Sequence, residues 1–160
     1  MQELNITLKV QVYSEPSQLS ESEQQLLKEA RAALHKAYAP YSKFKVGAAL
    51  RLMNNAIISG ANQENAAYPM CLCAEQVALA AAASTYPGVP VVAMAIVVES
   101  ENHLIEQPAA PCGACRQVIS ETEDRHKHNI TIFLQGSQGD IYKVESGKLL
   151  LPLSFNASFL

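Results

Sequence analysis

The chain has 160 residues, of which 49% are hydrophobic and 17% are charged. This composition describes one well-packed globular domain and excludes a chain that is mostly disordered. The 12 lysines and arginines stand against 15 acids, which gives a formal net charge of −3. Such a balance does not suggest a basic face that holds phosphates, so we expect no nucleic-acid partner.

The N-terminal residues do not look like a targeting signal. They lack the basic start, the apolar stretch and the small-residue cleavage site of a signal peptide. No apolar run approaches the length of about 18 residues that spans a bilayer. We therefore expect a cytoplasmic protein without a membrane partner, in which thiols stay reduced. Metal ligation or catalysis is then a better interpretation of the cysteines than disulfides.

The first third of the chain predicts a strand followed by a helix. Residues 5–13 alternate apolar and polar side chains, with Ile6, Leu8, Val10 and Val12 on one side, which is the period of a strand with one buried face. A capping box, formed by Ser20 and Glu23, opens a run of apolar residues at helical spacing. This pattern predicts a helix from about residue 20 to residue 38.

The rest of the chain predicts four strands, a closing turn and strand, and two helices. Asn54-Asn55 joins two apolar stretches, which predicts a tight hairpin. The nearly continuous apolar run at 90–100 suits a central strand that is covered on both faces. Helices are predicted over 73–86 and 115–123, and strands over 129–136 and before Gly147. This order predicts one α/β domain, a mixed sheet covered by helices in three layers.

The four cysteines form two pairs that lie far apart in the sequence. Three arrangements are open: two disulfides, a closed zinc site with four cysteine ligands, and an open zinc site with three. Disulfides suit the even count but not a reducing compartment. The closed site is typical of C-x-x-C pairs, whereas the first pair here is C-x-C and lies about 40 residues before the second.

The open site explains more of the pattern. If Cys112 and Cys115 begin a helix, their spacing of three lets both side chains reach one ion. If Cys73 begins another helix, both helix dipoles stabilise thiolates. Three thiolates leave the fourth tetrahedral position for water, which is the mark of a catalytic zinc site. Glu75 is the nearest carboxylate that can take the water proton, and Cys71 is the spare cysteine, expected to be buried near the site.

Longer segments share a pattern with one known family. C-A-E followed by P-C-G-A-C is the zinc-deaminase signature. Together with the segments 37–50, 60–79 and 111–119, this signature closely resembles the small homotetrameric cytidine deaminases with three cysteine ligands. The resemblance covers about residues 20–156. It implies a cytidine-deaminase-like α/β/α fold with a mainly five-stranded mixed sheet.

The resemblance also divides the chain and implies a metal site. Residues 19–160 would form the single catalytic domain, and residues 1–18 an N-terminal extension, expected to be an extra strand that either pairs with a sheet edge or adds to a subunit interface. One zinc ion per subunit would be held by Cys73, Cys112 and Cys115. Glu75 would move the proton from water to the base and then to the leaving amino group.

Further residues are implied to bind the substrate. Phe44 matches the aromatic ring that lies against the base, and Asn62 and Glu64 match the residues that bind the ribose hydroxyls. The backbone of Ala74 would orient the base, and the carbonyl of Ala110 would receive the amino group. A carboxylate, an amide and an aromatic ring are the partners that the hydroxyls, polar edges and apolar face of a nucleoside need.

Two aromatic residues resemble positions that reach into a neighbouring subunit. Tyr68 and Phe155 would each complete a pocket in trans, so the active sites of a homotetramer would be shared. The C-terminal segment 149–160 is apolar for a chain end, which agrees with burial in an assembly.

The chain departs from the family pattern beside the catalytic glutamate. The residue after C-A-E is usually arginine, which offsets the negative charge of a three-thiolate zinc site, but here it is Gln76. Arg116 or the two helix dipoles would have to compensate. We predict that activity is retained.

We therefore predict hydrolytic deamination of free cytidine and deoxycytidine in pyrimidine salvage. One alternative is a deaminase for another aminated nucleoside of the blasticidin-S type. Asn62 and Glu64 favour a free ribose, because a modified sugar would leave each of them unpaired at a cost of about 1–3 kcal/mol. A second alternative is a non-enzymatic interaction domain with structural zinc, which would use four cysteine ligands and tolerate the loss of Glu75.

Overall fold

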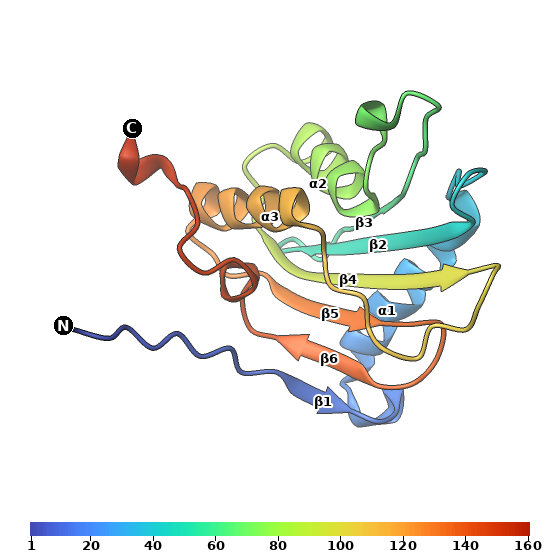
Figure 1. Cartoon of the computed structure of the whole chain (residues 1–160), viewed down its shortest axis with the longest axis horizontal. Helices are drawn as coiled ribbons and strands as arrows, with labels where there is room; N and C mark the ends of the chain where they lie inside the picture. Colours follow the sequence, from blue (N-terminus) through green and yellow to red (C-terminus); the bar gives the residue numbers. More distant parts are fainter.

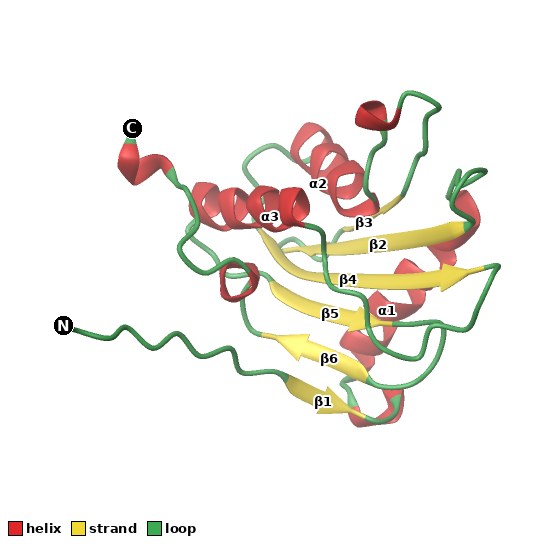
Figure 2. Cartoon of the chain, viewed as in Figure 1, coloured by secondary structure: helices red, strands yellow, loops and turns green.

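Six strands and three α-helices make up the fold, and the computed structural model describes residues 1–160. In chain order the elements are β1 (Gln11–Tyr13), α1 (Glu21–Ala33), β2 (Phe44–Leu52), β3 (Ile57–Ala61), α2 (Ala74–Thr85), β4 (Val91–Ser100), α3 (Gly113–His126), β5 (Thr131–Gln135) and β6 (Ile141–Val144) (Figure 2). None of the helices is both long enough and apolar enough to cross a membrane.

All six strands join one sheet, in the order β1-β6-β5-β4-β2-β3. β4 is central and pairs with β2 antiparallel and with β5 parallel. Every other pair of neighbouring strands is antiparallel, so the sheet is mixed, as predicted. Its sixth strand is β1, which adds to β6 at one edge of the expected five strands.

The helices cover the sheet on both faces. α1 lies on one face, and α2 and α3 lie side by side on the other (Figure 1). A cluster of 16 buried residues fills the space beneath α2 and α3, and a cluster of 10 lies beneath α1. At Gly60 on β3 the backbone of α2 is so close that an added Cβ atom would lie 2.6 Å from the Ala78 nitrogen. The three-layer α/β/α prediction is confirmed.

The first helix begins as predicted but ends earlier. The Ser20 backbone N–H donates to the Glu23 carboxylate at 2.9 Å, and the Glu23 N–H donates back to the Ser20 hydroxyl, so the capping box is formed. α1 ends at Ala33 and a single 3-10 turn follows. The predicted end at residue 38 was wrong because the Tyr38 N–H donates to the Asn62 carbonyl, which draws the chain into a loop contact instead.

The predicted N-terminal strand is much shorter than the alternating pattern. Only Gln11–Tyr13 pairs with β6, because β6 itself ends at Val144. Ile6, Leu8 and Val12 are exposed, so the prediction that they form a buried face was wrong.

Candidate metal centre and active site

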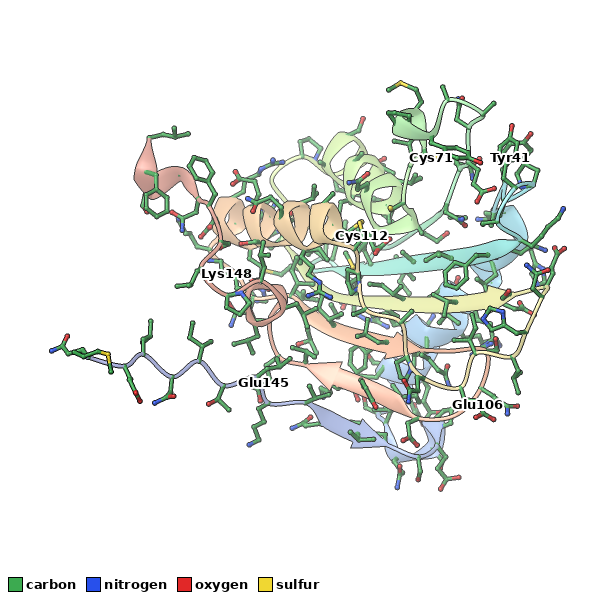
Figure 3. The ribbon with its side chains drawn as sticks, viewed as in Figure 1. Tyr41, Cys71, Glu106, Cys112, Glu145 and Lys148 are labelled. Carbon is green, nitrogen blue, oxygen red and sulfur yellow. The ribbon has the colours of Figure 1, made fainter.

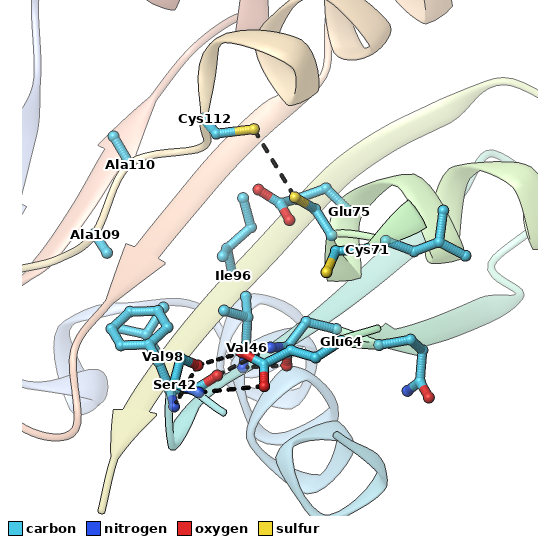
Figure 4. Close-up of a pocket in the computed structure, with 15 residues that line it drawn as sticks. Ser42, Val46, Glu64, Cys71, Glu75, Ile96, Val98, Ala109, Ala110 and Cys112 are labelled. Carbon is cyan, nitrogen blue, oxygen red and sulfur yellow. Dashed lines mark hydrogen bonds between the residues drawn. The ribbon is translucent and has the colours of Figure 1, made fainter. Parts of the chain in front are cut away.

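The N-terminal ends of α2 and α3 bring three cysteines together. Cys73 is the N-cap residue of α2, Cys112 is the N-cap residue of α3, and Cys115 lies in the first turn of α3. The Sγ atom of Cys112 (Figure 4) lies 3.9 Å from that of Cys73. It lies 3.4 Å from that of Cys115. All three sulfur atoms are within 4.8 Å of one another. The two helices thus converge as the sequence predicted.

The sulfur positions suit a tetrahedral metal ion. Zinc–sulfur bonds of about 2.3 Å place two ligands of a tetrahedron about 3.8 Å apart, close to the separations of 3.4 and 3.9 Å in this cluster. A disulfide needs a distance of about 2.05 Å, and all four cysteines are free, so the disulfide alternative was wrong. The sulfur of Cys71 instead accepts a hydrogen bond from the Asn65 N–H at 3.2 Å and lies outside the cluster, which excludes the closed four-cysteine site.

One sulfur of the cluster, that of Cys73, loses its proton readily. The hydrogen bond from the Cys115 thiol lowers the pKa of Cys73 to about 6, and the same bond raises the pKa of Cys115, which keeps its proton. The Cys115 backbone N–H also points at the Cys112 sulfur at 3.5 Å, as expected at a helix N-terminus. A divalent cation held by these sulfurs would replace the thiol protons that remain.

Glu75 lies beside the sulfur cluster in the first turn of α2. Glu75 is only 4% exposed, and the hydrogen bonds that act on its carboxylate come from its own backbone N–H and from the Cys115 thiol. Burial raises the pKa of Glu75, while its own backbone N–H and the Cys115 thiol lower it to a smaller extent. A buried carboxylate with a raised pKa and free lone pairs is suited to taking up and releasing a proton.

A cavity of about 440 Å³ opens in front of Glu75 and the sulfurs. Its walls come from the start of β2, the end of β4, the loop that leads into α2 and the segment before α3 (Figure 4). The lining residues are Ser42, Phe44, Val46, Asn62, Gln63, Glu64, Cys71, Leu72, Cys73, Glu75, Ile96, Val98, Ala109, Ala110 and Cys112. Two of them are carboxylates and none is lysine, arginine or histidine, so the cavity favours a neutral ligand over an anion.

The residues predicted to bind a sugar lie together on one side of this cavity. The Asn62 amide accepts a hydrogen bond from the Val46 N–H at 2.8 Å and donates to the Phe44 carbonyl at 2.9 Å. This contact ties the loop that follows β3 to the beginning of β2. Phe44 and Asn62 both line the cavity, and the hydrogen bond from the Asn62 amide to the Phe44 carbonyl holds them next to each other.

Glu64 is held by the turn that precedes β2. Its carboxylate accepts hydrogen bonds from the Tyr41 N–H at 2.8 Å, from the Ser42 N–H at 3.3 Å and from the Ser42 hydroxyl. The Ser42 hydroxyl is the largest cause that lowers the pKa of Glu64 below its ordinary value, and Lys43 contributes from outside the cavity. Glu64 therefore stays ionised, and its carboxylate points toward Ser42 on one side of the cavity (Figure 4).

Sequence reasoning missed Ser42 and most of the apolar wall. The local signal for Ser42 was its position two residues before Phe44, whose N–H donates to the Ser42 hydroxyl at 3.0 Å. That signal predicts a turn, but not the contact with Glu64, which lies 22 residues later. The other missed lining residues are Val46, Gln63, Leu72, Ile96, Val98 and Ala109.

The remaining predicted substrate residues lie in different places. Ala110 lines the cavity, whereas Ala74 is fully buried behind it as the first residue of α2. Tyr68 and Phe155 are exposed and do not line the cavity of their own chain. The Tyr68 ring meets the Tyr41 ring edge-on, at a centroid distance of 6.2 Å.

Neither Arg116, which was expected to offset the thiolate charge, nor Gln76, which replaces the usual arginine, forms a hydrogen bond with a cysteine sulfur. Arg116 donates to the Pro111 carbonyl at 2.8 Å and to the Leu150 carbonyl at 3.0 Å, so it fixes the backbone just before Cys112. Gln76 lies in a groove between α2 and α3, together with Val118 and other residues. The helix N-termini, rather than these side chains, face the sulfur cluster.

Comparisons with known proteins agree with this site. The family profile described as "Cytidine and deoxycytidylate deaminase zinc-binding region" matches residues 20–129. A cytidine deaminase of Halalkalibacterium halodurans is 42% identical over 134 residues, which cover 84% of this chain and 94% of that protein. One of Sporosarcina psychrophila is 41% identical over 128 residues, covering 79% and 87%.

Solved structures show the same fold. The crystal structure of cytidine deaminase from Burkholderia pseudomallei has a TM-score of 0.71 at 42% identity, and the match covers 86% of this chain and all of that chain. The cytidine deaminase structure from Mycobacterium tuberculosis has a TM-score of 0.64 at 30% identity, covering 84% and 97%.

Proposed function

Because the chain belongs to the cytidine and deoxycytidylate deaminase family, we propose that it hydrolyses free cytidine and deoxycytidine to uridine and deoxyuridine, with release of ammonia. The observation that carries this proposal is the cavity, in which a buried carboxylate and three convergent sulfurs meet a wall without a single basic residue. Family members act on nucleosides or nucleotides. A 5′-phosphate would bring negative charge close to Glu64, so a free nucleoside is the better substrate.

The cysteine cluster fits one zinc ion per subunit. Cys73, Cys112 and Cys115 would hold the metal, which when bound supplies a water molecule that is acidic near neutral pH. The alternative of a structural zinc domain needs four protein ligands, and this cluster has three. The donor set is therefore that of a catalytic site.

Glu75 would carry the proton through the reaction. Its carboxylate takes a proton from the attacking water and delivers it to the ring nitrogen N3 of the base. The oxygen forms a bond to C4, the bond from C4 to the amino nitrogen breaks, and a second proton moves through Glu75 to the departing ammonia. The raised pKa of Glu75, caused mainly by burial, supports this role, because a group that takes up and releases protons near neutral pH is an effective general acid and base.

The other cavity residues would orient the nucleoside. Phe44 offers its ring to the base, and the Ala110 carbonyl offers an acceptor to the amino group, with the backbone of Ala74 near the base. Asn62 and Glu64 are suited to the ribose hydroxyls. Because the carboxylate of Glu64 has about four acceptor positions and the turn uses three, one stays open for a hydroxyl donor.

Shared active sites in a homotetramer form part of this proposal. Tyr68 and Phe155 are large aromatic side chains that are exposed in the single chain, although aromatic rings are usually enriched where surfaces become buried. We infer that each reaches the cavity of a neighbouring subunit. We also infer a cytoplasmic role in pyrimidine salvage.

The test is a panel of substrates followed by ultraviolet absorbance. We expect turnover of cytidine and deoxycytidine by the purified zinc-loaded protein, and turnover of cytidine monophosphate that is lower by at least about a hundredfold. A Glu75→Ala variant with the same zinc content should be inactive. Turnover of the monophosphate at a similar rate would overturn the nucleoside assignment. If neither compound reacts while zinc is bound, other aminated nucleosides become the substrates to examine.

A further inference from the structure

The chain carries an N-terminal arm, residues 1–10, that the family fold does not use. The matched family region begins at residue 20. No hydrogen bond outside the β1–β6 ladder joins residues 1–10 to the rest of the protein. The arm leaves the sheet at β1 and runs free of the body of the molecule, with its side chains spread on both sides (Figure 3). Its sequence is nevertheless that of a strand.

An apolar stripe runs along one face of the arm and β1. It consists of Leu4, Ile6, Leu8 and Val12, which are 77%, 52%, 45% and 56% exposed. Val10 has the same parity and touches the core beneath α2 and α3, whereas Tyr13 touches the core beneath α1. Because side chains alternate across a strand, an arm that continues β1 carries the whole stripe on the side of the sheet that bears α2 and α3. Nothing in the single chain covers it.

The chain has no strand of its own to pair with the arm. The register Gln11↔Lys143, continued along the ladder, places Val10 opposite Val144, where β6 ends. Beyond that point the chain turns into the 3-10 segment Gly147–Leu150. β1 is also the outermost strand of the sheet, so its other edge is unpaired. An apolar edge strand of this kind is a template for pairing with another chain.

We propose that the arms of two copies of this chain pair with each other as antiparallel strands, with Ile6 of one copy opposite Ile6 of the other. In this register the partner of each residue is found by subtracting its number from 12. Leu4 then faces Leu8, so the apolar stripes of both copies lie on one face of the ribbon. The partner that pairs with the arm is therefore the same segment of a second copy of the chain.

Charge selects this register over its neighbours. Glu3 and Lys9 are the only charged side chains among residues 1–13. In the proposed register Glu3 of each copy lies opposite Lys9 of the other copy, which gives two pairs of opposite charge. A shift by one pair sets Glu3 against Gln11 or Thr7 and leaves Lys9 without an acid. A shift by one residue would move the stripe to the opposite face. Opposite charges and apolar pairs across strands are each stabilising.

The contact closes on itself, because each copy contributes the same residues around a twofold axis. It adds an interface to any contact that the domains make elsewhere, and a tether of this kind strengthens association by raising the effective concentration of the linked subunits. The inference does not depend on the chemistry of the cavity, so it stands or falls separately from the proposed activity.

Cysteine cross-linking tests the register directly on the full zinc-loaded chain. Under mild oxidation with oxidised glutathione, we expect an Ile6→Cys variant to form a disulfide-linked dimer, since position 6 faces itself. Leu4→Cys and Leu8→Cys should each stay at the level of the parent chain when oxidised alone, and form the dimer when mixed. Mass spectrometry of the linked peptides identifies the joined positions and separates them from the native cysteines.

Charge reversal in the Ile6→Cys background provides the second readout. Glu3→Lys or Lys9→Glu should each lower the yield of dimer about tenfold, and the double reversal should restore it to within about twofold. Equal cross-linking at positions 4, 6 and 8, each oxidised alone, would overturn the register. Absence of any dimer above the parent level, with zinc content unchanged, would overturn the pairing itself.

Discussion

Two glutamates lie equally deep in the helical layer and yet have opposite surroundings. Glu75 on α2 is 4% exposed and Glu123 on α3 is 2% exposed. The Glu123 carboxylate accepts hydrogen bonds from the N–H groups of Ile130 at 2.7 Å and Gly147 at 2.8 Å, and from the Ser146 hydroxyl at 2.8 Å. Glu75 faces the cavity and has no such set of donors.

The difference separates a structural carboxylate from a chemical one. Burial alone does not distinguish them, because both would be costly to ionise without partners. Glu123 joins the end of α3 to the start of β5 and to the segment after β6, and its acceptor positions are used. Unused acceptor capacity on a buried carboxylate that faces a cavity is the feature that points to proton transfer.

The largest effect is expected for activity on changing Glu75. Glu75→Gln should lower kcat for cytidine by about 10²–10⁴-fold, because an amide of the same shape cannot carry the proton. The matched control is Glu123→Gln, which should keep kcat within about threefold of the parent below its melting temperature. Initial rates at saturating cytidine, normalised to zinc content, provide the measurement. Equal losses in both variants would remove the distinction between the two glutamates.

For stability, in contrast to activity, the substitution of Glu123 should have the larger effect and that of Glu75 the smaller. Glu123→Ala leaves the N–H groups of Ile130 and Gly147 and the Ser146 hydroxyl without an acceptor, and should lower the free energy of unfolding by about 3 kcal/mol or more. Glu75→Gln should change it by less than about 1 kcal/mol, since the amide oxygen of glutamine can still accept the two hydrogen bonds that act on the carboxylate. Urea denaturation of both zinc-loaded variants measures the difference. A stable Glu123→Ala chain would contradict the structural role.

Glu64 is intermediate between the two glutamates: its carboxylate has hydrogen-bond donors, as that of Glu123 does, but it lines the cavity, as Glu75 does. Ser42→Ala removes one of its donors and should raise KM for cytidine about three- to tenfold, with kcat within about twofold. Ser42 lowers the pKa of Glu64, so the carboxylate of the variant should take up a proton at a higher pH as the solution is acidified. The excess in KM should therefore grow between pH 7 and pH 5.

Ser42→Thr keeps the hydroxyl and serves as the control for this prediction. Its KM should lie close to that of the parent at both pH values. A fall in kcat with an unchanged KM in Ser42→Ala would show that Ser42 does not act on substrate binding.

The smallest effect is expected next to Glu75. The side chain of Gln76 makes no hydrogen bond in the single chain and lines the groove with Val118. Gln76→Ala should keep kcat within about twofold and should not change the rate at which a chelator removes zinc. Rapid loss of zinc from this variant would show that the glutamine supports the thiolates.

The features predicted correctly from sequence depend on neighbours within a few residues. The capping box of Ser20 and Glu23, the Asn54-Asn55 hairpin and the shared direction of Cys112 and Cys115 are all of this kind. Such contacts cost little chain entropy and are encoded by spacing. The ends of elements were predicted less well, because they depend on distant residues. The chain leaves the helical path after α1, where the Tyr38 N–H donates to the Asn62 carbonyl, and β1 is limited by the end of its partner strand β6.

The sequence by itself determined which chemical groups are present: three thiols at two helix starts, a glutamate beside the first of them, and an apolar core for one mixed sheet. Only the tertiary structure decided which polar groups are free to react. Ser42 with Glu64, and Ser146 with Glu123, meet across 22 and 23 residues. Hydrogen bonds over such separations form only after strands and helices have packed, so a glutamate's role follows from the donors that the fold brings to it.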